Sequence, residues 1–267
     1  MKLYKRAAAL ILTAATLLSL APPVSAEGDR VTISSAKEFY ALVQNCTRDV
    51  WSQRVTVELT ADLDLSGSDF QPIPIFQGTF HGNGHTIRGI TYDHKGSTLG
   101  LFRTLTESAV VEGLCVEGLL EPQGSASQLG LLAGENYGAI RSCSAKGTVS
   151  GQEDVGGLVG VNGETGRIEG SSSQVQISGV TNVGGIAGQN LGTLDRCINT
   201  GALNSDPDQE IPTSVGGIAG LSRGTIQSCS NSGEIGYQHL GYNMGGIVGL
   251  QSGSILQCSN TGQVWGR

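Results

Sequence analysis

The chain has 267 residues, of which 38% are hydrophobic and 15% charged, and its formal net charge is −7. This acidic balance argues against nucleic acid and anionic membrane surfaces as partners. Glycine is the unusual component, at 41 residues. Because these glycines follow no G-X-Y period, a collagen-like fold is excluded.

Residues 1–26 have the pattern of a secretory signal peptide. A basic start precedes an apolar run over 7–20, and a small-x-small cleavage site ends at Ala26. The run is too short to cross a bilayer comfortably, and no later segment is a transmembrane candidate. We therefore expect cleavage after Ala26 and a secreted, extracellular protein, cell-surface association being left open. Loss of three basic residues moves the formal charge from −7 to −10 (−7 − 3).

Residues 27–54 are predicted to form an N-terminal cap. Ser35 and Glu38 have the spacing of a capping box, which predicts a short helix that continues to about Asn45. Its apolar face consists of Phe39, Leu42 and Val43. The cap is expected to cover the apolar end of the domain that follows.

Residues 55–128 alternate like short strands and are predicted to be irregular leading coils of a solenoid. Asp62 and Asp64 lie on the outer face of one strand, near Asp69. We interpret these acids as a solvated face, because calcium sites and carboxylate catalysis need oxygens that converge on one point. His81 and His85 flank a Gly-Asn-Gly turn and are interpreted as surface turn residues.

The segment 129–267 contains five copies of one repeat unit. The units begin at Leu129, Val155, Val183, Val215 and Met244, so the steps are 26, 28, 32 and 29 residues. This period indicates a solenoid whose units stack to bury their apolar faces. Gly, Ser, Asn and β-branched residues at strand-like spacing favour three short strands per turn, one of them around each GGIAG stretch. The predicted fold is all-β, a right-handed parallel β-helix of about seven coils with a short N-terminal capping helix.

Paired glycines such as Gly156 and Gly157 recur in the units. They suit a corner that needs either a positive φ or the absence of a side chain.

Four of the six cysteines occupy one column of the repeat. With a serine they form a predicted structural ladder of Cys143, Ser171, Cys197, Cys229 and Cys258. We interpret it as a buried stack of free thiols, although a bridge between the neighbours Cys229 and Cys258 stays open. No C-x-x-C pair or Cys/His cluster indicates zinc. Two residues further on, an asparagine column is placed to hydrogen-bond along the stack. It contains Asn199, Asn231 and Asn260.

The units, with V-G-G-[IL]-[VA]-G followed by G-x-[IL]-x-x-C, resemble GLUG-motif repeats. Such repeats occur in bacterial secreted and cell-surface proteins, including large adhesins and the N-terminal regions of IgA-specific metallopeptidases. The stretch GTFHGNGHTIRGI resembles the leading coil that often precedes them, so the resemblance covers nearly the whole mature chain. It implies the fold and an extracellular location, and it implies no activity. The H-E-x-x-H zinc helix of the metallopeptidases is absent.

The sequence predicts no catalytic residue, metal ligand or cofactor. We identify no nucleophile motif and no column that stacks acids beside a base, as pectate-lyase-type β-helices have. The units are instead interrupted by two insertions, over 204–214 and 236–243. Insertions in a solenoid form loops on one side, often the binding side. The candidate ligand-binding residues are Asp206, Asp208, Glu210, Tyr237, His239 and Tyr242. Solvated loops without a ligand are the alternative.

We therefore expect a non-catalytic, secreted or cell-surface β-helix for adhesion, binding or display, with an extracellular glycan or a host or surface protein as partner. The alternative is an accessory or truncated N-terminal domain of a larger extracellular protease or polysaccharide-acting enzyme. Since no cap follows the last strand, end-to-end association through the C-terminal coil is a further expectation.

Overall fold

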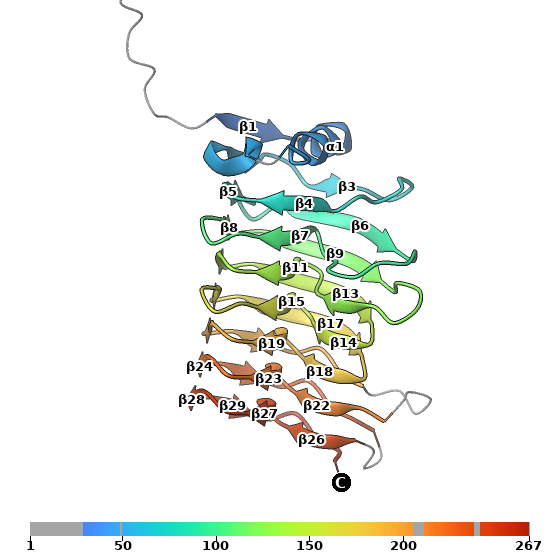
Figure 1. Cartoon of the computed structure of the whole chain (residues 1–267), viewed down its shortest axis with the longest axis vertical. Coiled ribbons are helices and arrows are strands. Elements are labelled where there is room, and N and C mark those ends of the chain that lie inside the picture. The colour runs from blue at the N-terminus through green and yellow to red at the C-terminus, as the bar shows by residue number, and fades with distance from the viewer. Residues whose placement is uncertain (1–28, 49, 205–210, 238–240, 267) are drawn as a thin grey trace, which may run out of the picture.

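The computed structural model describes residues 29–48, 50–204, 211–237 and 241–266. The predicted signal peptide lies outside these residues. The chain winds into a parallel β-solenoid with one helix at its N-terminal end (Figure 1). Within the described ranges, no helix is both long and apolar enough to cross a membrane.

Four parallel sheets run along the solenoid. Sheet 1 contains β1 (Arg30–Ile33), β2 (Thr56–Leu59), β5 (Thr79–His81), β8 (Val110–Glu112), β12 (Ala139–Arg141), β16 (Arg167–Glu169), β20 (Thr193–Asp195), β24 (Thr225–Gln227) and β28 (Ser254–Leu256). Sheet 2 contains β3 (Leu63–Asp64), β6 (Thr86–Tyr92), β9 (Cys115–Leu120), β13 (Ser144–Ser150), β17 (Ser172–Ser178), β21 (Ile198–Asn199), β25 (Ser230–Asn231) and β29 (Ser259–Asn260).

Sheets 3 and 4 complete each coil. Sheet 3 contains β10 (Ser127–Leu129), β14 (Glu153–Gly156), β18 (Thr181–Gly184), β22 (Thr213–Gly216) and β26 (Tyr242–Gly245). Sheet 4 contains β4 (Ile73–Phe76), β7 (Phe102–Leu105), β11 (Ala133–Asn136), β15 (Val159–Asn162), β19 (Ala187–Asn190), β23 (Ala219–Ser222) and β27 (Val248–Gln251). The eight strands of sheet 2 correspond to eight turns, close to the predicted number.

Like residues stack on like residues. The register pairs Ile140 with Ile168, Ile168 with Leu194, and Leu194 with Ile226. These side chains are fully buried. One inward apolar column thus continues from coil to coil, which confirms the predicted parallel β-helix.

The GGIAG stretch is not one strand but is divided by a corner between the end of one strand and the start of the next, so the prediction of three strands per coil was wrong. In the second unit β14 ends at Gly156 and β15 begins at Val159, and a full coil therefore has four strands. A Cβ on Gly157 would lie 2.1 Å from Ser173 Oγ and 2.4 Å from Gly185 O. The absence of a side chain, and not a positive φ, is what this corner requires.

Positive φ angles occur at other points of the coil, and most of the non-glycine residues that have them form two columns. One column lies between sheets 1 and 2 and includes Ser142, Gly170, Arg196 and Ser228, with φ of 50°, 56°, 51° and 52°. The other lies in sheet 3 and its approach. It consists of Thr98, Gln128, Asp154, Asn182, Ser214 and Asn243. Both columns put non-glycine residues in the left-handed region, which is costly for most side chains.

Two asparagine ladders run along the interior. In the predicted ladder, Asn199 Nδ2 donates to Asn231 Oδ1 and Asn231 Nδ2 donates to Asn260 Oδ1, each at 2.7 Å. A second ladder was not anticipated. Asn136 Nδ2 donates to Asn162 Oδ1 at 2.8 Å, and Asn162 Nδ2 donates to Asn190 Oδ1 at 2.9 Å. Both ladders also satisfy backbone groups at the coil corners.

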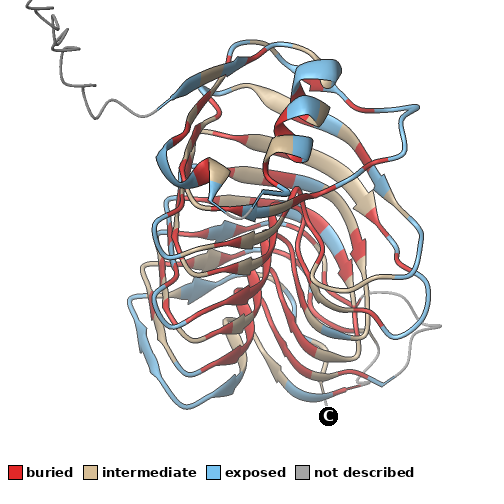
Figure 2. Ribbon diagram, turned by 45° about the horizontal axis from the view of Figure 1, so that its top comes forward, coloured by how far each residue is buried: buried red, intermediate tan, exposed pale blue. Residues whose placement is uncertain are grey.

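The N-terminal end of the solenoid is closed by α1 (Ala36–Asn45). Ser35 Oγ accepts the N–H of Glu38 at 3.4 Å, and the Glu38 carboxylate accepts the N–H of Ser34 at 2.8 Å. The apolar face predicted for the helix is buried. Figure 2 shows α1 lying across the end of the stacked coils. A one-turn 3-10 helix, Trp51–Arg54, follows before sheet 1 continues.

The types of residue that fill the core change along the axis of the solenoid. All five phenylalanines lie between Phe39 and Phe102, and Phe76, Phe80 and Phe102 pack together with ring centroids 5.4–6.2 Å apart. Later coils are filled by Val, Ile, Leu, Ala and Cys. The leading coils are therefore built around aromatic rings, and the repeated coils around small aliphatic columns.

Candidate functional site

The described residues that flank the two predicted loops lie side by side. Residues 205–210 and 238–240 lie outside the described residues, and with them the candidates Asp206, Asp208, Glu210 and His239. On the N-terminal side of the two loops, Leu203 pairs with Ile235 in a parallel bridge. On their C-terminal side, the N–H of Tyr242 donates to the carbonyl oxygen of Pro212 at 2.9 Å. Tyr237 is half-buried and Tyr242 is 50% exposed.

The predicted cysteine column lies inside the coils. Cys143, Cys197 and Cys229 are buried, and Cys258 is partly exposed. The N–H of Cys143 donates to Ser171 Oγ at 3.1 Å, and the N–H of Cys197 donates to Cys229 Sγ at 3.3 Å. All six cysteines are free, and the bridge between Cys229 and Cys258 is not formed.

Burial makes the thiols of Cys143 and Cys197 poor nucleophiles. Desolvation raises the pKa of Cys143 to about 12, and it does the same for Cys46 at the C-terminal end of α1. The contact with Cys229, together with burial, raises the pKa of Cys197. The same contact lowers the pKa of Cys229, but this thiol is buried and away from solvent. Since the thiolate is the reactive form, the column acts as packing and not as a reactive site.

The acids near the N-terminal coils form separate pairs. Asp62 accepts the N–H of Thr86 at 3.0 Å and lies 3.2 Å from His85 Nδ1. Hydrogen bonds from Ser66, and then from Arg88, hold the pKa of Asp64 down at about 2. His94 Nε2 lies 3.7 Å from Asp69. In the part of the chain that the structure describes, no three His, Cys, Asp or Glu side chains are grouped as metal ligands would be.

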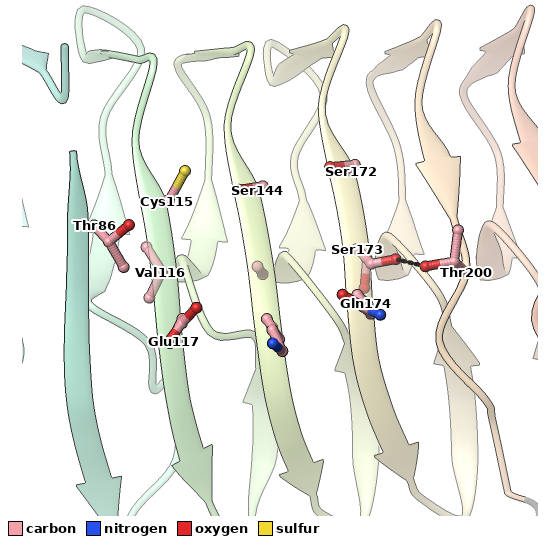
Figure 3. Close-up of a pocket in the computed structure, with 11 residues that line it drawn as sticks. Thr86, Cys115, Val116, Glu117, Ser144, Ser172, Ser173, Gln174 and Thr200 are labelled. Atoms are coloured by element: carbon pink, nitrogen blue, oxygen red, sulfur yellow. Dashed lines mark hydrogen bonds between the residues drawn. The ribbon is translucent and has the colours of Figure 1, made fainter. Parts of the chain in front are cut away.

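A groove on the outer face of sheet 2 is the strongest candidate for a binding surface. It consists of two hollows, of about 300 Å³ and 490 Å³, that share Lys146 and Gln174. We call it the lateral groove. Its outward-facing residues are Thr86, Cys115, Glu117, Ser144, Lys146, Ser172, Gln174, Gln176 and Thr200. Figure 3 shows most of them on neighbouring strands, from Thr86 on β6 to Thr200 directly after β21.

The lateral groove exists because the side chains along one of its columns are short. Cys115, Ser144 and Ser172 occupy one outward column, in register on β9, β13 and β17. The adjacent outward column carries longer polar groups, since Glu117 pairs in register with Lys146 and Lys146 with Gln174. The register thus stacks a base beside an acid, as it also does for Arg141 between Glu112 and Glu169. The prediction that no column has this arrangement was wrong.

Glu117, Lys146 and Gln174 have no protein partner. Among the described residues their side chains make no hydrogen bond or ion pair, whereas several other outward acids are paired. Glu112 lies 2.8 Å from His81, Asp64 lies 3.1 Å from Arg88, and Glu169 contacts Arg196. One carboxylate, one ammonium and one amide are therefore free to bind a ligand across three coils.

The lateral groove was not predicted from the sequence, although its unpaired polar residues follow a recognisable spacing. Glu117, Lys146 and Gln174 each stand two positions after a Ser or Cys, as in Cys115-Val116-Glu117 and Ser144-Ala145-Lys146. The residue type varies between coils, so this column does not repeat in the way that the cysteine and asparagine columns do.

The comparisons with known proteins identify the repeats. The GLUG motif matches residues 125–150 and 151–178, which confirms the resemblance seen in the sequence. These two motifs contain β13 and β17, the central strands of the lateral groove.

The chain is 32% identical over 141 residues to Halomucin of Haloquadratum walsbyi, a match that covers 48% of this chain and 2% of that protein. It is 33% identical over 96 residues to a protein of Evansella cellulosilytica that is provisionally named a Gly-rich membrane protein. That match covers 34% of this chain and 11% of that protein. The chain thus spans a small part of these relatives.

Among solved structures, the fold is similar to that of a Bacteroides ovatus protein provisionally named an immunoglobulin A1 protease. The TM-score is 0.64, and the match covers 85% of this chain and 74% of the other at 22% identity. A likeness at this level of identity concerns the fold alone.

Proposed function

We propose that this GLUG-repeat solenoid is a non-catalytic extracellular or cell-surface protein that binds a glycan along its lateral groove, in the service of adhesion or display. One observation carries the proposal. Glu117, Lys146 and Gln174 stand in register on adjacent strands, exposed or half-exposed, with no protein partner in the described chain.

The chemistry of the groove favours a glycan over a protein. Protein interfaces are anchored by large apolar or aromatic side chains in desolvated pockets, and none of the outward-facing groove residues is of that kind. Sugar hydroxyls both donate and accept hydrogen bonds. They match a carboxylate, an ammonium, amides and the hydroxyls of Ser144 and Ser172.

The same residues favour binding over hydrolysis. Glycoside hydrolysis uses a pair of carboxyl groups across the scissile bond. Of the described residues that line the groove, Glu117 is the one carboxylate. An extracellular or surface location is supported by the signal-like residues 1–26 and by a relative that is named a membrane protein.

A glycan array tests this function. The chain without residues 1–26 is compared with the double variant Lys146→Ala/Gln174→Ala. A matched control, Arg167→Ala/Gln227→Ala, removes one basic and one amide group from the outer face of sheet 1. We expect the groove variant to lose at least tenfold in affinity for the bound glycans, and the control to bind like the parent.

Equal binding by the groove variant and the parent would exclude the lateral groove. In that case a further variant, Tyr237→Ala/Tyr242→Ala, tests the predicted loops on the described residues that flank them. A loss confined to this variant would move the site from the groove to the loops.

An accessory role in a larger extracellular enzyme is the second candidate. It is favoured by the small share, 2% and 11%, that the matches occupy in the longer relatives. Sequencing of the gene region downstream tests it, since a catalytic domain in the same reading frame would support this role over the first.

A further inference from the structure

The lateral groove follows the axis of the solenoid and crosses one coil after another (Figure 3). Its first hollow, of about 300 Å³, is lined from Thr86 on β6 to Thr200 directly after β21. The strands β6, β9, β13, β17 and β21 are successive members of sheet 2, and neighbouring strands of a sheet lie about 4.8 Å apart. The hollow therefore suits a long, narrow ligand better than a compact one.

Each coil presents a similar small set of side chains to the lateral groove. One short side chain per coil faces it, and these side chains stand in register on β6, β9, β13 and β17. We call them the short column, which consists of Thr86, Cys115, Ser144 and Ser172. Three of the four coils add a polar side chain two residues further along the strand, namely Glu117, Lys146 or Gln174. Repeat proteins that bind a polymer can read one unit with each repeat, as helical repeats do with the bases of RNA.

The spacing of the coils favours a glycan over a peptide as that polymer. An extended peptide advances by about 3.3–3.4 Å per residue, so it falls out of step with strands about 4.8 Å apart. The rings of a linear, extended glycan follow one another at a distance close to the strand spacing, so one ring fits on each coil. Of the described residues that line the groove, one is acidic and one is basic, and the formal net charge of the chain is −7. A polyanionic glycan is therefore repelled, and a neutral one is favoured.

One bulky side chain interrupts the short column. Ser172 pairs in register with Ile198 on β21, and Ile198 pairs with Ser230 on β25. The Ile198 side chain is 48% exposed, so it stands on the outer face of sheet 2 between two serines. Neither hollow of the lateral groove is lined by Ile198 or by Ser230. The run of short side chains that begins at Thr86 therefore ends at Ile198.

We propose that the lateral groove binds a neutral, linear glycan along the solenoid axis, with one sugar residue on each coil, and that Ile198 sets the length of the bound stretch. This inference rests on the proposed function of the groove. The short column has one member on each of four coils, so four sugar residues are held. The branched side chain of Ile198 occupies the position that a fifth ring would need, and a longer glycan gains no further contact.

Calorimetric titration with glycans of increasing length tests this inference. The probes are cello-oligosaccharides and chito-oligosaccharides of two to eight sugar residues, added to the chain without residues 1–26. We expect the affinity to rise up to four sugar residues and then to stay level.

Ile198→Ser restores a short side chain between Ser172 and Ser230. In this variant a hexasaccharide should bind about fivefold more tightly than a tetrasaccharide, which is the effect of about one additional hydrogen bond. Ser172→Ile moves the bulky side chain one coil towards the N-terminus, so the rise in affinity should stop at three sugar residues.

Ile75→Ser is the matched control. It makes the same substitution at a side chain that is 46% exposed on β4 of sheet 4, away from the groove, and should show the length dependence of the parent. Circular dichroism checks that each variant is folded.

Two sets of results separate this inference from the proposed function. A parent that binds neither series, or a folded Ile198→Ser variant whose affinity levels off at four sugar residues, would overturn the inference. The proposed function would still stand if the array showed that Lys146→Ala/Gln174→Ala loses glycan binding. If that variant bound like the parent, the proposed function would fail and the inference with it.

Discussion

At the scale of single residues, the backbone conformation at a position of this fold does not depend on the type of side chain there. The column between sheets 1 and 2 contains serine, arginine and glycine in the same left-handed conformation, with φ near 50°. The continuous sheets on both sides impose this conformation, and the residue type only sets its cost. Glycine is therefore the least strained residue in the column.

Gly170 allows a clean measurement of that cost. Its φ is +56° and a Cβ there would touch nothing closer than 3.9 Å, so crowding makes no contribution. Gly170→Ala should lower the free energy of unfolding by about 1 kcal/mol. Gly170→Asn should lower it less, because asparagine visits the left-handed region more readily. Urea unfolding of both variants is the measurement. Equal losses would show that φ is not the cause.

The cysteines should react in two classes. Cys115 and Cys258 are partly exposed, while Cys46, Cys143, Cys197 and Cys229 are buried. Because burial also raises the pKa of Cys143 to about 12, little thiolate exists there at neutral pH. A short pulse of iodoacetamide followed by peptide mass spectrometry should label two sites in native protein and six after unfolding. Rapid labelling of Cys197 and Cys229 would contradict a packed column.

The cysteine and asparagine columns could be placed from the sequence, because each recurs at one offset from the apolar position. The left-handed columns could not. Ser, Arg, Gln, Asn and Asp share no chemistry that marks them, and their conformation follows from the sheets around them. The free side chains Glu117, Lys146 and Gln174 were missed for a similar reason, since pairing depends on the neighbouring coil.

At the scale of elements, α1 shows how much a local signal can determine. Ser35 and Glu38 predicted its start, and the helix ends at Asn45 as expected. Strand boundaries were harder. The GGIAG stretch is apolar and continuous, like a buried strand, and only the close approach of Gly157 to the next coil reveals a corner.

The capping helix should matter more for stability than its length suggests. Phe39 is fully buried and α1 packs over β4. Phe39→Ala should therefore lower the free energy of unfolding by about 3–5 kcal/mol. Gln44→Ala, on the exposed side of the same helix, should change it by less than about 0.5 kcal/mol. Thermal and urea unfolding measure both. Similar values for the two variants would mean that α1 does not seal the core.

At the scale of the whole molecule, each coil contacts mainly the coils above and below it, and stability is then a sum over neighbouring interfaces. The four sheets keep one register through coils of different length, since Leu203 pairs with Ile235 and Thr213 with Tyr242 although the number of residues between these positions differs.

Removal of one complete coil should leave a folded protein. Asn182 and Ser214 are equivalent in the repeat, with φ of 54° and 60°, so deletion of 183–214 joins Asn182 to Val215 in register. We expect native-like circular dichroism, a smaller radius of gyration and a lower unfolding midpoint. Deletion of 183–198, which is half a coil, should not fold. A folded half-coil variant would show that register is not required.

The closed N-terminal end also sets an order of events in time. During synthesis the N-terminal part of a chain emerges first, so α1 and the aromatic leading coils exist before any repeat is complete. Each later coil then grows on a finished template, and the chain needs no long-range search to close its sheets. Chains arrested at residues 177, 203 and 235, which are equivalent positions of successive coils, should accordingly show protease-resistant cores that lengthen by one coil at a time.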